Sequence, residues 1–94
     1  MNILAKADEL VNGDRAKDYG HPLDNHSVTA EMFSAFVARK YGLNVTFQAE
    51  DVAVFNMVQK IARLSNSPGH MDSLVDIAGY AATYQMILDK RETK

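Results

Sequence analysis

Apolar residues recur along the chain at intervals of three and four positions, the spacing that gathers them on one side of a helix. Clusters of turn-forming residues separate four such segments. We therefore predict four helices, over Ile3–Val11, over Pro22–Lys40, over Phe47–Leu64, and from Pro68 or His70 to Asp89. No alternating run is long enough for a strand, apart from the brief Val45–Phe47, and residues 90–94 are expected to fray.

Residues that start and stop helices fix the predicted boundaries. Pro22 suits a first turn and Gly42 suits a helix end. Thr46 is the predicted cap of the third helix, and Ser67 followed by Pro68 is the predicted start of the fourth.

The composition is that of an ordinary globular chain, with 94 residues of which 47% are hydrophobic and 23% charged. The predicted fold is all-α, a compact four-helix bundle in a single domain over residues 1–94. A chain this short buries a smaller fraction of its surface than a larger chain does, so we expect a homo-oligomer that completes the core.

Composition also excludes several functions. The chain has no cysteine, which rules out disulfides and thiolate metal sites. Lys6, Asp8 and Glu9 interrupt the apolar stretch that a signal peptide needs, and no apolar run approaches a membrane span, so we expect a soluble cytoplasmic protein without a membrane partner. The net charge is −2 and the basic residues are scattered, so a nucleic-acid partner is not expected.

One stripe of the fourth predicted helix gathers its polar residues. At about 100° per residue it contains Asp72, Asp76, Gly79, Tyr80 and Thr83, with apolar residues on both sides. Asp76 is the only charged residue between Ser73 and Leu88. A carboxylate in such a setting must be paired, hydrogen-bonded or metal-bound, because burying it alone costs several kcal/mol or more. A salt bridge or a hydrogen bond to Tyr80 or Arg15, without chemistry, accounts for Asp76 as well as a ligand site does.

Gly79 in the middle of this helix predicts a close approach to its backbone, either of another helix, which we favour, or of a ligand. On the third helix, Asn56, Gln59, Lys60 and Arg63 share one sector opposite the apolar residues. That sector would be an ordinary solvated face if the fourth helix carried no acids. Asp51 points to the apolar side near the helix start, as a metal ligand or equally as a first-turn acid.

Other chemistries find little support. His21, expected in a rigid turn, and His26, expected at the edge of the core, are five positions apart and so do not share a helical face, which argues against zinc. There is no cysteine nucleophile, no serine elbow and no glycine-rich phosphate loop.

Four motifs together resemble small bacteriophage proteins that are similar to the all-α MazG-like nucleotide pyrophosphohydrolases and to phage nucleotide-modification-associated domains. The motifs are Arg15-Ala-Lys-Asp-Tyr19-Gly20-His21-Pro22 with Asn25, Asp51-Val-Ala-Val, Lys60-Ile-Ala-Arg63-Leu64, and His70-Met-Asp72-Ser-Leu-Val-Asp76-Ile-Ala-Gly79-Tyr80-Ala81. They extend from about Arg15 to Tyr84.

The resemblance implies an oligomeric helical bundle in which acids hold Mg²⁺ against the phosphates of a nucleotide, so that a metal-activated water attacks between the α and β phosphates. Asp72, Asp76 and Asp51 would be the metal ligands, and Lys60, with Arg63 and Arg15, would neutralise phosphate charge. Tyr19 or Tyr80 would contact the nucleoside, and His21, Asn25 and Asn56 complete the predicted ligand site.

The sequence departs from the enzymatic pattern, which has Glu-x-x-Glu on one helix and Glu-x-x-Asp on the next. Here the second helix has Glu31 alone, between Ser27 and Ser34, and the fourth has Ser73-x-x-Asp76 with Asp72. Fewer acids predict weaker Mg²⁺ binding, so whether the protein hydrolyses its ligand stays open. The alternative is a non-catalytic interaction module that dimerises through the Asp72–Tyr80 stripe and binds a host protein.

Overall fold

The computed structural model describes residues 1–13 and 20–92, and this part of the chain is helical, without strands. It contains α1 (Ile3–Asn12), α3 (Pro22–Tyr41), α4 (Ala49–Asn66) and α5 (Met71–Glu92). The all-α prediction is confirmed. No helix among the described residues is long and apolar enough to cross a membrane.

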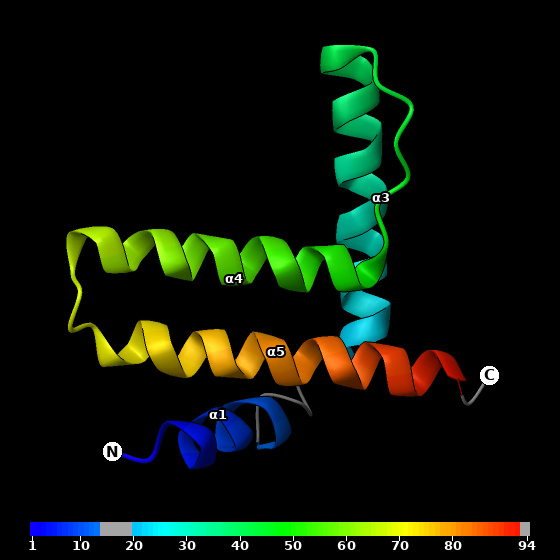
Figure 1. The fold of residues 1–94 in the computed structure, drawn as a ribbon. Coiled ribbons are helices and arrows are strands. Elements are labelled where there is room, and N and C mark those ends of the chain that lie inside the picture. The colour runs from blue at the N-terminus through cyan, green and yellow to red at the C-terminus, as the bar shows by residue number, and fades with distance from the viewer. Residues whose placement is uncertain (14–19, 93–94) are drawn as a thin grey trace.

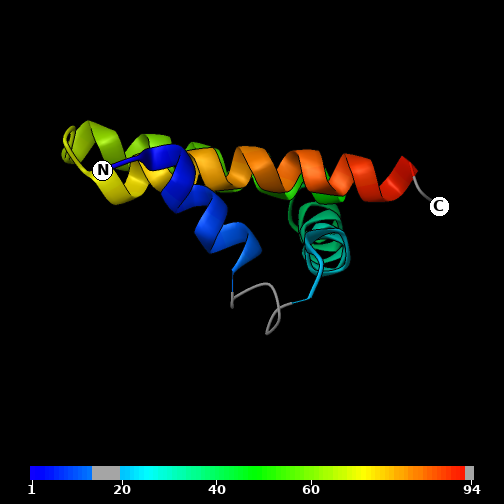
Figure 2. The same ribbon diagram turned by 90° about the horizontal axis from the view of Figure 1, so that it is seen from below.

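The helices α4 and α5 lie side by side and antiparallel, and α3 crosses the end of this pair (Figure 1). In Figure 2, α1 and α3 both lie on one side of the layer that α4 and α5 form. In Figure 1 the C-terminal end of α3 extends past α4, and the single chain is more extended than the compact bundle that we predicted. Its radius of gyration is 14.5 Å, against about 12 Å for a compact chain of this length.

The boundaries of α3 agree with the sequence. The imidazole Nδ1 of His21 accepts a hydrogen bond from the Leu23 backbone N–H at 3.0 Å, and Pro22 occupies the first turn. Gly42 ends the helix with φ = 67°, a left-handed conformation that glycine adopts without steric cost, and its N–H donates to the Ala38 carbonyl.

The predicted start of α4 is wrong by two residues, and Thr46 is not its cap. The Phe47 backbone N–H donates to Ser34 Oγ at 2.8 Å, which holds Phe47 outside the helix. The helix begins at Ala49, and the Asp51 carboxylate accepts a hydrogen bond from the Gln48 N–H at 2.8 Å. Asp51 is thus a first-turn acid that caps its own helix.

Both ends of α5 differ from the prediction. Ser67 ends α4, because its N–H donates to the Arg63 carbonyl, so it does not cap α5. The helix begins at Met71, and the His70 ring accepts from the Ser73 N–H. At the other end residues 90–92 are helical, where Arg91 makes two hydrogen bonds of 2.7 Å to Glu50 of α4. This pair ties down a segment that we expected to fray.

Small side chains dominate the core. Four of the eight buried apolar residues are alanines, which lets the helices approach closely but buries little apolar area. They are Ala7, Leu23, Ala30, Ala49, Val52, Ala53, Val75 and Ile87.

Candidate ligand-binding site

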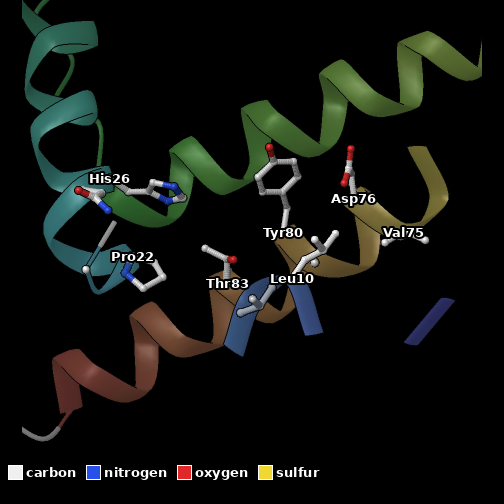
Figure 3. A pocket seen from close by; sticks show the side chains of 11 residues that line it. Leu10, Pro22, His26, Val75, Asp76, Tyr80 and Thr83 are labelled. Atoms are coloured by element: carbon white, nitrogen blue, oxygen red, sulfur yellow. The ribbon is translucent and has the colours of Figure 1, made fainter. Parts of the chain in front are cut away.

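A cavity of about 340 Å³ lies between the end of α1, the start of α3 and the middle of α5 (Figure 3). Four members of the polar stripe predicted on α5 lie in its wall, namely Asp76, Gly79, Tyr80 and Thr83. They share the wall because positions 76, 79, 80 and 83 fall within one side of a helix. The other lining residues are Leu10, Val11, Gly20, Pro22, Asn25, His26 and Val75.

Asp76 is paired with a cation from the neighbouring helix. Lys60 Nζ of α4 lies 3.0 Å from Asp76 Oδ2, and the two side chains are 17% and 31% exposed. In Figure 3, the Asp76 and Tyr80 side chains both point from α5 toward α4. The pairing expected for a lone acid in an apolar helix is therefore present, and it neutralises the carboxylate at one end of the cavity.

At the other end of the cavity, His26 of α3 has an unsatisfied polar atom. Its Nδ1 is buried and has no hydrogen-bond partner among the residues that the structure describes. Burial lowers the pKa of this imidazole below its usual value, because the charged form loses its hydration. The His26 ring points toward the Tyr80 side of the cavity (Figure 3). Its unpaired nitrogen can form one hydrogen bond with a ligand.

The remaining predicted site residues lie in different places. Asn25 lines the cavity, whereas the exposed Asp72 in the first turn of α5 does not. Asn56 is half-buried and Arg63 is exposed on α4. His21 caps α3, and Arg15 and Tyr19 lie outside the described residues.

Within the described residues, the three acids predicted to hold Mg²⁺ do not gather around one point. Asp51 caps α4, Asp76 pairs with Lys60, and Asp72 lies outside the cavity wall. Within residues 1–13 and 20–92, no three His, Cys, Asp or Glu side chains are arranged to hold a metal ion. Binding of Mg²⁺ by these acids therefore stays a prediction.

Sequence reasoning gave no role to two groups that the structure brings to this site. His26 was expected at the edge of the core, and its sequence position does not indicate that it meets α5. Leu10 and Val11 of α1 form a wall of the cavity, and their spacing predicted only an apolar helix face. Gly79 did carry a signal: an added Cβ would lie 3.6 Å from Val11 Cγ2, so the close approach predicted there is that of α1.

A family model described as a domain of unknown function, DUF6378, matches residues 2–88. The chain belongs to the DUF6378 family. The matched region contains the whole cavity wall and the Lys60–Asp76 pair.

The DUF6378 domain is also similar to two phage proteins. The Gene 55 protein of Mycobacterium phage L5 is 44% identical over 85 residues, which cover 90% of this chain and 51% of that protein. The Gene 55 protein of Mycobacterium phage D29 is 35% identical over 89 residues, which cover 95% of this chain and 55% of that protein. The chain thus spans about half the length of these curated relatives, and their origin supports the expected bacteriophage association.

No solved structure matches the DUF6378 domain. The likeness to MazG-like pyrophosphohydrolases, inferred from the four motifs, therefore stays a prediction.

Proposed function

We propose that this DUF6378 domain binds a nucleotide or a nucleotide-derived ligand in the cavity between α1, α3 and α5. The observation that carries the proposal is the wall of that cavity. It combines a buried imidazole nitrogen of His26, unpaired among the described residues, with the neutralised carboxylate of Asp76. Unpaired polar atoms in a buried position cost free energy, and a ligand that bonds to them recovers it.

The size and chemistry of the cavity suit a nucleoside. A volume of about 340 Å³ lies at the lower end of the range of roughly 300–1,000 Å³ for small-molecule sites. Leu10, Val75 and the Tyr80 ring supply apolar surface, while Thr83 and His26 supply hydrogen-bonding groups. A flat base with polar edges matches such a wall, with the Tyr80 ring available for stacking.

The Lys60–Asp76 pair would meet the phosphates. A phosphate group that enters beside Asp76 would share the Lys60 ammonium with it, because an ammonium has three N–H donors. Arg63 lies one turn further along α4 and adds a second positive charge. The proposal concerns binding, and hydrolysis with Mg²⁺ would need acids beyond Asp76 at the cavity.

Calorimetry with a panel of dNTPs, dNMPs and nucleosides, each with and without Mg²⁺, tests the proposal. We expect heat from at least one nucleotide, and about tenfold or greater weakening in Thr83→Val, which removes a hydroxyl from the wall without changing its shape. Thr29→Val makes the same change on α3 outside the cavity wall and should leave the affinity unchanged. No heat from any nucleotide, in a sample shown by circular dichroism to be folded, would overturn the proposal.

A second candidate function is a non-catalytic interaction module that binds a host protein. The observation in its favour is the set of exposed apolar side chains on α3 and α4, among them Phe36, Val58 and Ile61. The same candidate required the acidic stripe of α5 to form salt bridges across a dimer, whereas Lys60 and Asp76 pair within one chain. The ligand-binding proposal is therefore favoured.

A further inference from the structure

The helix α4 buries the apolar residues of its first turns, but further along it exposes large apolar side chains. Lys60, which pairs with Asp76 of α5, is only 17% exposed in its side chain, and Asn56 one turn before it is half-buried. Val58 and Ile61, in contrast, are 56% and 54% exposed. A surface helix normally exposes polar residues, so the exposed apolar side of α4 has the character of a surface that something covers.

The exposed apolar surface continues from α4 onto α3. The rings of Phe33 and Phe55 meet edge to face, with centroids 5.6 Å apart, and both rings remain more than a third exposed. We use the term apolar face for Phe33 and Phe36 of α3 with Val54, Phe55, Val58 and Ile61 of α4. Contiguous exposed apolar surface of this kind marks an interaction site in a soluble domain.

We infer that the apolar face is the interface between two copies of this chain. The surface area supports a second copy as the occupant. The chain exposes 6578 Å², whereas a compact monomer of this mass exposes about 5,400 Å². This excess of about 1,200 Å² belongs to the whole chain, and it is larger than the roughly 800 Å² per partner that a standard interface buries.

The composition of the core also supports a dimer. Half of the buried apolar residues are alanines, while larger apolar side chains, Phe36, Val58 and Ile61 among them, remain exposed. Pairing two apolar faces removes these side chains from water in both copies at once. The inference does not depend on the ligand, because none of the six residues lines the cavity.

Light scattering and sedimentation equilibrium test the inference on the whole chain. We expect a mass twice the 10.4 kDa of one chain, and a melting temperature that rises with protein concentration, as linkage requires for a dimer. Val58→Glu should give a monomer with unchanged helicity, because the side chain is exposed in the single chain. Ile61→Lys, one turn further along the same side, should have the same effect.

Leu4→Glu is the matched control, since Leu4 is 75% exposed but lies on α1, outside the apolar face. It should leave the dimer intact. A wild-type monomer at all concentrations would overturn the inference, and so would a dimer that resists Val58→Glu and Ile61→Lys together. A wild-type monomer that instead binds a host protein through Val58 would assign the face to that partner and overturn the inference equally.

Discussion

Lys60 of α4 and Asp76 of α5 form an ion pair between these two adjacent antiparallel helices, with Nζ 3.0 Å from Oδ2. Asp76 also lines the cavity, so the pair joins the packing of the fold to the candidate site. Both side chains are mostly covered, so water hydrates neither charge fully, and each charge is stabilised by its partner.

Asp76→Asn should lower the free energy of unfolding by about 1–3 kcal/mol, because it leaves the covered Lys60 ammonium without its anion. Urea unfolding of Asp76→Asn, of Lys60→Met and of the double variant would measure the coupling energy between the two side chains. Asp89→Asn changes an exposed carboxylate of the same helix and should stay within about 0.5 kcal/mol of wild type. A gain in stability from Asp76→Asn would contradict this account and show that Asp76 carries an uncompensated charge.

Gly79→Ala should stabilise the protein by roughly 0.5–1 kcal/mol, the helix propensity difference, because the added Cβ makes an ordinary contact with Val11 at 3.6 Å. The same methyl group takes up space in the cavity, so the affinity for a nucleotide should fall while the stability of the fold rises. Gly13→Ala is the opposite case, since its Cβ would collide with the Glu9 carbonyl oxygen, and we expect it to destabilise. Thermal melts of the two variants would distinguish the cases, and equal shifts would contradict the packing described.

Glu50 and Arg91 should give the protein a stability that depends on acidity. The hydrogen bonds from Arg91 lower the pKa of Glu50 below its usual value. The contribution is therefore present above about pH 4.5, near the pKa of an unfolded glutamate, and is lost as the pH falls through the lower folded value. Glu50→Gln should destabilise the protein at neutral pH by less than Asp76→Asn does. The difference from wild type should shrink on acidification, and a pH-independent difference would contradict the pairing.

The helices that could be predicted from the sequence are those bounded by strong local signals. Pro22 and Gly42 fix α3 because each restricts or relieves the backbone at its own position. The starts of α4 and α5 were missed because distant or competing groups decide them. Phe47 is held by Ser34, thirteen residues away, and Ser67 bonds back to α4 instead of capping α5.

Some residues of the candidate site were likewise predictable from the sequence and others were not. The polar stripe of α5 was predictable because helical periodicity alone brings Asp76, Tyr80 and Thr83 together. The unpaired nitrogen of His26 was not predictable, since it depends on how α3 packs against α5. Periodicity placed Lys60 in a solvated sector of α4, whereas its pair with Asp76 covers most of that side chain and Val58 and Ile61 remain exposed.

His26 should make the stability sensitive to pH in a second, higher window. Burial lowers its pKa in the folded state, so between that value and about pH 6.5 the unfolded chain binds more protons. Its contribution to stability is therefore complete above about pH 6.5 and is lost as the pH falls through the folded pKa. His26→Leu removes both the titration and the buried unpaired nitrogen, so it should be neutral or stabilising at neutral pH and increasingly stabilising relative to wild type as the pH falls. Urea unfolding of wild type and His26→Leu from about pH 7.5 to about pH 5.5 would measure this. If a nucleotide bonds to the imidazole, the same variant loses affinity while it gains stability; a variant that loses stability at every pH would show that His26 supports the fold and not a ligand.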